Sequence, residues 1–180
     1  MVFAPAARAA EPSLAGFSAE ALGGIGFQLN GPGNPFGPGF GLRAGYTLEP
    51  GFFLGGSGAY YFGLEPGDGE TGLLEGEVGF DLPLGRGSLR PYLGAGVAAI
   101  RDQEMFACAA DSGPQDCFPV ERGFEPKFLW TLGARGAYPV AELLQLGLDA
   151  RFHIMPDEQG FTESGLRVAF AVHAVVGARL

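Results

Sequence analysis

Every second position of segment 166–180 is apolar. One face carries Leu166, Val168, Phe170, Val172, Ala174, Val176, Ala178 and Leu180, and the other carries Arg167, His173 and Arg179. A period of two places successive side chains on opposite sides of a β-strand, whereas a helix would mix the two sets. Segment 144–154 repeats the pattern, with Leu144, Leu146, Leu148, Ala150, Phe152 and Ile154 opposite Gln145, Asp149, Arg151 and His153. Both segments are therefore predicted to be strands with one wholly apolar face.

Further segments bring the predicted number of strands to eight. Alternation is clear in 74–84 and 127–140, and it can also be followed in 17–29 and 40–48. Segments 52–64 and 89–100 have the composition of strands, but Gly, Ala and aromatic residues occur on both faces. The sequence therefore leaves the orientation of those two strands open.

The connections between the predicted strands alternate in length. Short turns are expected at 49–51, 85–88 and 141–143, and longer loops at 31–39, 65–70, 101–124 and 156–163. Alternate connections of an up-and-down barrel lie at opposite ends, as in bacterial outer-membrane barrels. We therefore predict an all-β fold, an eight-stranded antiparallel up-and-down transmembrane β-barrel, with both termini at the short-turn, periplasmic end.

Period-two alternation does not say which face is inside. A soluble lipocalin-like ligand-binding barrel would turn the same apolar face inward. Its exterior would then be poor in charge, since only 17% of the residues are charged, against about 25% in an average soluble domain. An eight-stranded lumen is just wide enough for side chains, so small residues and a few long polar ones suit an interior. The membrane orientation is favoured for this reason.

Charged residues of both signs then fall on the lumen side. They are Glu20, Glu75, Glu77, Asp81, Glu125 and Asp149, together with Arg43, Lys127, Arg135, Arg151, Arg167 and Arg179. Shielded charges are tolerable when they are paired, so we predict an ion-pair network that plugs the barrel. A relay or a narrow cation path is the alternative, although a channel usually has an excess of one sign.

Aromatic residues are candidates for the two interfacial girdles of a membrane barrel. Amphipathic rings lie at headgroup depth in such proteins. The candidates are Phe52, Phe53, Tyr60, Tyr61, Phe62, Trp130 and Tyr138. In a soluble protein the same residues would be ordinary core packing.

The N-terminus and the two cysteines bear on export. Residues 1–10 end in Ala7-Arg8-Ala9-Ala10, which is typical of a signal-peptide cleavage site, or they are a disordered terminus; 11–180 would be the barrel domain. In an oxidising compartment Cys108 and Cys117 would form a disulfide that stabilises their loop by about 2–3 kcal/mol. A pair of free thiols is the alternative in a cytosolic protein.

Segment 90–97, Arg-Pro-Tyr-Leu-Gly-Ala-Gly-Val, resembles a strand opening common in the OmpA/OmpW-like outer-membrane β-barrel superfamily. The resemblance implies a small, usually non-catalytic barrel and names no ligand. Members of the superfamily typically end in an aromatic residue that the assembly machinery reads. This chain ends in Leu180, which lies on the apolar face but is not aromatic.

Other function classes find little support in the sequence. The net charge of -9 argues against nucleic acid, and Gly94–Ala99 lacks the helix that a dinucleotide site needs. We predict no catalytic residue, cofactor or metal. The predicted protein is a monomeric, non-enzymatic barrel of a Gram-negative outer membrane. Its partners would be membrane lipid, the assembly machinery and a surface ligand at the long loops. The alternatives are a narrow barrel that passes small or apolar solutes and a lipid-modifying enzyme using His153 or His173.

Overall fold

The computed structural model describes residues 15–30, 34–65, 68–101, 105–108, 117–120, 123–156 and 165–180, the two short stretches by their backbone alone. Their secondary structure is entirely β. The strands are β1 (Gly16–Gln28), β2 (Pro38–Leu48), β3 (Phe52–Phe62), β4 (Glu70–Phe80), β5 (Leu82–Leu84), β6 (Gly87–Arg101), β7 (Met105–Cys108), β8 (Cys117–Val120), β9 (Glu125–Pro139), β10 (Leu144–Pro156) and β11 (Leu166–Arg179). Within these ranges we find no helix of the length and apolarity needed to cross a membrane.

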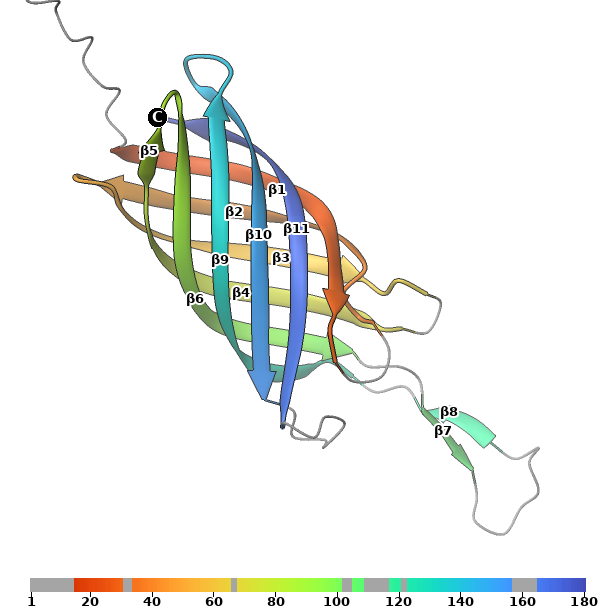
Figure 1. Cartoon of the computed structure of the whole chain (residues 1–180). Helices are drawn as coiled ribbons and strands as arrows, with labels where there is room; N and C mark the ends of the chain where they lie inside the picture. Colours follow the sequence, from red (N-terminus) through yellow and green to blue (C-terminus); the bar gives the residue numbers. More distant parts are fainter. Residues whose placement is uncertain are drawn as a thin grey trace, which may run out of the picture.

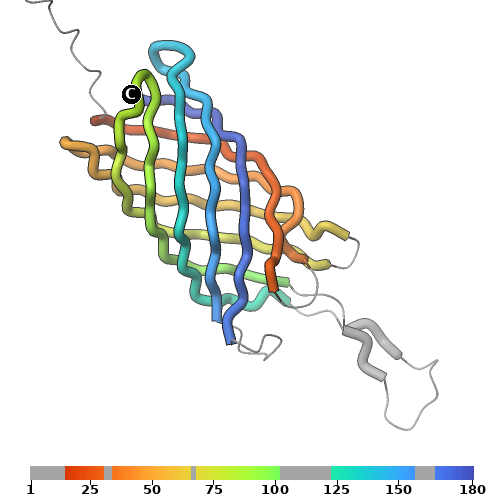
Figure 2. The backbone as a smooth tube through the Cα atoms, in the orientation of Figure 1, coloured from red at the N-terminus to blue at the C-terminus, as the bar shows by residue number. Residues whose placement is uncertain are grey.

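The main sheet closes on itself to form a barrel (Figure 1, Figure 2). Its strands lie in the order β4-β3-β2-β1-β11-β10-β9-β6-β5, and an additional pairing of β4 with β6 joins the two ends. Strand β5 continues the line of β4 after an interruption at Asp81 and pairs with β6. The two pieces occupy one place in the barrel. The predicted eight-stranded antiparallel barrel is therefore confirmed.

Short and long connections lie at opposite ends of this barrel. The short turns join β2 to β3, β5 to β6 and β9 to β10, and the two chain ends of the barrel meet beside them (Figure 1). There Phe17 and Leu180 exchange backbone hydrogen bonds of 3.1 and 2.9 Å. We call this the turn end and the opposite one the loop end. The alternation of connection lengths thus predicted the arrangement of the two ends correctly.

Strands β7 and β8 form a separate two-stranded sheet within the longest connection. Their register pairs Met105 with Val120 and Cys108 with Cys117. The side chains of this sheet, and with them the predicted disulfide, lie outside the described residues. The same holds for the predicted signal-peptide remnant at 1–10.

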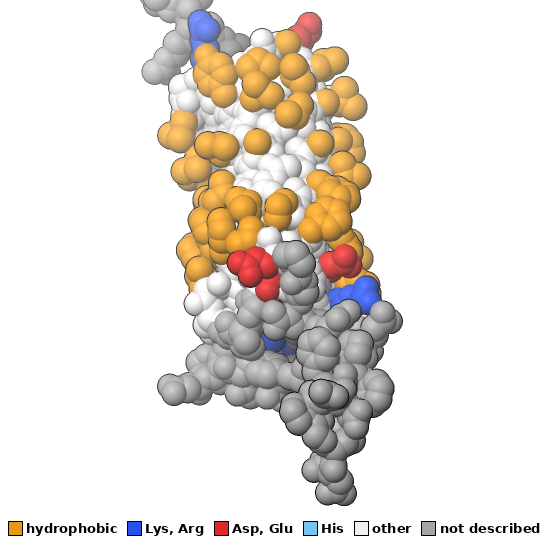
Figure 3. Space-filling view, turned by 90° about the vertical axis from the view of Figure 1, so that its right-hand side faces the viewer, with side chains coloured by type: hydrophobic (Ala, Val, Ile, Leu, Met, Phe, Trp, Pro, Cys, Tyr) orange, Lys and Arg blue, Asp and Glu red, His pale blue; other side chains and the backbone are white. Residues whose placement is uncertain are grey.

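The polarity of the barrel is inverted relative to a soluble protein. On the face of the barrel that Figure 3 shows, large apolar side chains form a broad band with charged groups near its edges. Leu42 and Leu74 are 69% and 71% exposed, whereas Arg43 and Asp149 inside the barrel are 1% and 0% exposed. A lipocalin-like barrel requires the opposite arrangement. The soluble alternative is therefore wrong.

Candidate functional site: the barrel lumen

Five arginines project into the lumen, each from a different strand. They are Arg43 on β2, Arg90 on β6, Arg135 on β9, Arg151 on β10 and Arg167 on β11, and none is more than 1% exposed. Successive side chains of a strand point to opposite faces of the sheet, and each of these arginines lies at a position that faces the lumen. Buried guanidinium groups need counter-charges and acceptors close by.

Asp149 is the centre of the network. Its carboxylate accepts hydrogen bonds from Arg43 Nη2 at 3.1 Å, from Tyr92 Oη at 2.9 Å and from Arg151 Nε at 2.7 Å. Arg151 also reaches across the lumen to Glu75, with Nη1 2.8 Å from Oε1. One carboxylate thus links side chains from three strands, β2, β6 and β10.

A second group of ion pairs surrounds the other side of Arg43. Its Nε lies 2.8 Å from Glu77 Oε2, and its Nη1 lies 3.4 Å from Glu20 Oε2. Arg135 Nε donates to the same oxygen of Glu20 at 2.9 Å. Arg43 therefore contacts three carboxylates, those of Glu20, Glu77 and Asp149, and joins the two groups.

Asp81 organises a third cluster close to the turn end. It accepts hydrogen bonds from Arg90 at 2.9 and 2.8 Å, from Thr47 at 2.9 Å and from Arg179 at 3.2 Å. The Arg90 guanidinium also lies 3.6 Å from the centre of the Phe53 ring, which is a cation–π distance. Beyond this cluster a cavity of about 710 Å³ opens among the turns.

The two histidines are part of the buried lumen. His173 Nε2 lies 2.8 Å from Tyr61 Oη, and its Nδ1 lies 3.5 Å from Asp149. His153 Nδ1 lies 3.0 Å from Thr131 Oγ1, which donates to Glu75. Both histidines are 0% exposed. A lipid-modifying enzyme would need its histidine on a wall that lipid can reach, so this geometry gives the enzymatic alternative no support.

Most of the buried side chains in the loop half of the lumen are apolar, although Lys127 and Arg167 are buried there as well. The apolar side chains form one cluster, which comprises Phe36, Ala59, Tyr61, Leu73, Ala98, Ile100, Leu129, Met155, Ala169 and Ala171. All of them except Phe36 lie on barrel strands; Phe36 lies on the connection between β1 and β2. The ion-pair network thus lies nearer the turn end of the lumen, and the apolar cluster lies nearer the loop end.

The structure brings most of the charged residues expected in the lumen into ion pairs there. Those in contact are Glu20, Arg43, Glu75, Glu77, Asp81, Arg135, Asp149, Arg151 and Arg179. Arg167 is buried, and Glu125 is half-buried at the loop end. Lys127 is also buried, but its Nζ has no hydrogen-bond partner in the part of the chain that the structure describes. It stands apart from the network.

Sequence reasoning missed Arg90 and Tyr92 as lumen residues. The sequence did not decide which face of segment 89–100 is inside. Leu93 and Val97 lie on the same face because they are four residues apart, and if that face is outside, Arg90 and Tyr92 face the lumen. In the structure Arg90 is 1% and Tyr92 2% exposed. The signal was present but weak, because glycine and alanine occupy both faces of the rest of the strand.

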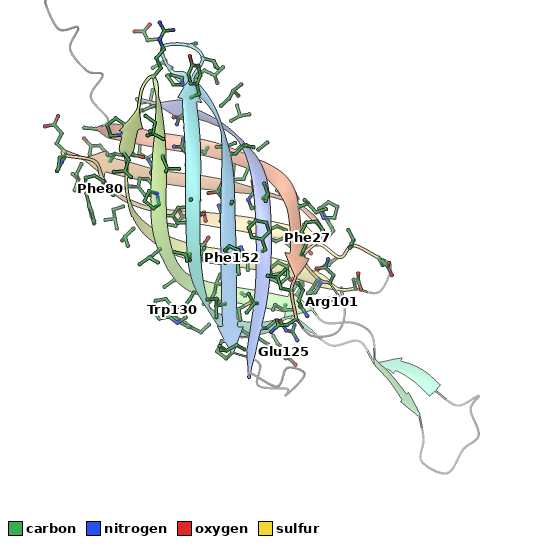
Figure 4. All side chains as sticks on the ribbon, viewed as in Figure 1. Phe27, Phe80, Arg101, Glu125, Trp130 and Phe152 are labelled. Atoms are coloured by element: carbon green, nitrogen blue, oxygen red, sulfur yellow. The ribbon has the colours of Figure 1, made fainter. Side chains whose placement is uncertain are left out.

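Four of the predicted girdle aromatics lie on the outside of the barrel. Phe52, Phe62, Trp130 and Tyr138 are between 44% and 57% exposed, and Figure 4 shows Trp130 pointing away from the wall. Tyr60 is half-buried and donates a hydrogen bond to Glu70.

The girdle assignment was wrong for Phe53 and Tyr61. Both are 0% exposed and point into the lumen. Each follows an outward aromatic directly in sequence, in the pairs Phe52-Phe53 and Tyr60-Tyr61. Adjacent residues of a strand cannot share a face, so only one of each pair can face outward.

Comparisons with solved structures identify the fold. Neisserial surface protein A matches with a TM-score of 0.61 and 14% identity, over 93% of this chain and 98% of that one. The N-terminal β-barrel domain of Pseudomonas aeruginosa OprF matches with a TM-score of 0.53, 16% identity and coverage of 92% and 99%. Ail, the attachment invasion locus protein of Yersinia pestis, matches with a TM-score of 0.52, 17% identity and coverage of 92% and 99%.

At these identities the likeness concerns the fold alone. No family model and no curated protein matches the sequence. The matches confirm the fold that the resemblance of segment 90–97 implied. The chain has the fold of the small eight-stranded outer-membrane β-barrels.

Proposed function

We propose that this protein is a non-enzymatic barrel of a Gram-negative outer membrane, in which the barrel is the anchor and the loop end faces outward to interact with a partner. The observation that carries the proposal is the inverted polarity. Exposed leucines such as Leu42 and Leu74 suit acyl chains, and buried pairs such as Arg151–Asp149 suit a lumen shielded from lipid. The pairing of β4 with β6 also closes the barrel, and hydrocarbon would not tolerate unpaired strand edges at that place.

Gel migration with and without boiling tests this proposal. Closed barrels of this class keep their fold in detergent until they are heated, so the unheated protein should migrate differently from the boiled protein. It should also require detergent for extraction. A protein that is released without detergent and shows one band under both conditions would refute the membrane assignment.

The long connection between β6 and β9 is the best candidate for the interaction itself. Its residues include Asp102, Glu104, Asp111, Asp116 and Glu121. A segment with this charge favours a basic partner surface, since complementary charge speeds association and lowers the affinity for acidic competitors. Replacing these carboxylates by amides should weaken binding of a basic partner, and unchanged binding would exclude the segment.

A disulfide between Cys108 and Cys117 would fix the tip of that connection. The register of β7 and β8 supports it, because the two residues are direct partners across the strands, where Cβ atoms are close enough for a bridge. We expect both thiols to resist alkylation until the protein is reduced. Alkylation of both before reduction would exclude the bridge.

Residues 1–10 would belong to a signal peptide that directs export. The outer-membrane assembly machinery would then insert the barrel as a monomer.

A further inference from the structure

The connection between β1 and β2 enters the barrel. Phe36, in this connection, is 0% exposed although it belongs to no strand. Its ring centre lies 5.5 Å from that of Tyr61 on β3 and 6.1 Å from that of His153 on β10. Since both partners face the lumen, the Phe36 ring occupies the space between opposite walls.

Segment 34–37 is attached to the wall on two sides. Asn34 Oδ1 accepts from the backbone N–H of Gln28 at 2.8 Å and of Phe36 at 3.3 Å. Gly37 accepts from Gly26 N–H at 2.9 Å and donates to the Phe62 carbonyl at 2.7 Å. The segment thus bridges β1 and the end of β3. A Cβ at Gly37 would meet the Phe62 carbonyl oxygen, so the approach requires glycine.

The layer around the ring differs chemically from the layer below it. Ala169, Ala171, Leu129 and Met155 are all buried in the cluster that contains Phe36. On β10 the next inward residue after His153, toward the turn end, is Arg151, and the ion pairs begin there. Arg151 is the direct partner of Ala171 on β11. An apolar layer offers water and ions no hydrogen bonds, so it blocks the lumen by a different means from the ion pairs.

We propose that segment 34–37 is a stopper that closes the loop end of the lumen independently of the ion pairs, with the Phe36 ring as its seal. The barrel then has two barriers in series. Removal of the ring would leave a chamber lined by the other residues of the apolar cluster. Small uncharged molecules would enter this chamber from the loop end, and the ion pairs would close it toward the turn end.

Chemical labelling of the chamber wall tests the proposal. Ala169 is 0% exposed and lies between Gln28 and His153 in the register, so Ala169→Cys places a thiol in the wall. The variant is made with Cys108 and Cys117 replaced by Ser, and the folded barrel is treated with methyl methanethiosulfonate, a small uncharged reagent. Labelling should be slow with Phe36 present and at least about tenfold faster in Phe36→Ala, because a buried thiol reacts only through rare opening.

Phe53→Ala is the matched control. It removes the same ring from a lumen position that is also 0% exposed, but in the cluster of Asp81 and Arg90 near the turn end. It should leave the labelling rate of Ala169→Cys unchanged. A rise of equal size in both variants would mean general loosening and would overturn the proposal.

Asn34→Ala is the second test and keeps the ring. It removes the acceptor for Gln28 and Phe36, so the labelling rate should fall between those of the parent and Phe36→Ala. If Phe36→Ala does not fold, as judged by the gel band of the unheated protein, Asn34→Ala alone tests the proposal. If the parent, Phe36→Ala and Asn34→Ala are labelled at equal rates, whether fast or slow, Phe36 does not control access to the chamber and the proposal is wrong.

Discussion

The lumen replaces water by a fixed set of counter-charges around each buried group. Asp149 illustrates this best, because it is 0% exposed and is contacted by Arg43, Tyr92, Arg151 and His173. Desolvating these groups costs free energy, and their mutual contacts offset that cost. A single neutralised member should therefore do more damage than the loss of one hydrogen bond.

We expect Asp149→Asn to destabilise the folded barrel by about 1–3 kcal/mol, because Arg43, Tyr92 and Arg151 would lose a charged acceptor. The remaining carboxylates Glu20, Glu75 and Glu77 still compensate the two guanidinium groups. Urea unfolding in lipid vesicles measures the difference. Glu142→Gln in an exposed turn is the control and should stay within about 0.5 kcal/mol of the parent. Equal stability of Asp149→Asn and the parent would mean that the network contributes specificity without stability.

At the level of strands, a glycine in the inner wall can make room for a large side chain of the neighbouring strand. Gly133 on β9 is an example, because a Cβ there would collide with the Tyr92 ring. Tyr92 in turn donates to Asp149. The glycine thus allows the tyrosine to reach the centre of the network.

Gly133→Ala should destabilise the barrel by about 1–3 kcal/mol, the usual cost of overpacking. Gly136→Ala, three residues further along the same strand, has nothing within 4 Å of its Cβ and should cost clearly less. Urea midpoints of the two variants give the comparison. Equal midpoints would show that Tyr92 moves aside without cost.

The strands also show how far the sequence alone reaches. In β10 and β11 all charged residues lie on one face and the other face is wholly apolar, so both the strands and their faces were predicted correctly. In β3 and β6 small and aromatic residues occur on both faces, so the sequence did not show that Phe53 and Arg90 face the lumen. There they contact each other past the intervening strand β4. Phe36 could not be predicted, because nothing in the sequence of a loop says that one of its residues enters the barrel.

At the scale of the whole molecule, the account depends on lipid contact around the barrel. Leu42 lies in the middle of β2 and is 69% exposed, whereas Leu84 lies beside a turn and is 61% exposed. A charge in the middle of the bilayer costs far more than one near the headgroups. The two leucines have similar exposure in the structure and differ in expected depth.

Leu42→Arg should therefore destabilise the barrel in vesicles by about 2–4 kcal/mol, and Leu84→Arg by about 1 kcal/mol or less. Unfolding in urea again supplies the numbers. If Leu42→Arg and Leu84→Arg lower the free energy of unfolding by the same amount, the two positions do not differ in bilayer depth, contrary to the account.

The most direct measurement uses Trp130, the single tryptophan of the chain. It is 57% exposed on the outer wall and packs edge-on against Phe128 at 5.0 Å. In vesicles of lipids with brominated acyl chains, its fluorescence should be strongly quenched, and aqueous iodide should have little effect. Efficient quenching by iodide, with none by the brominated chains, would contradict the membrane-facing barrel.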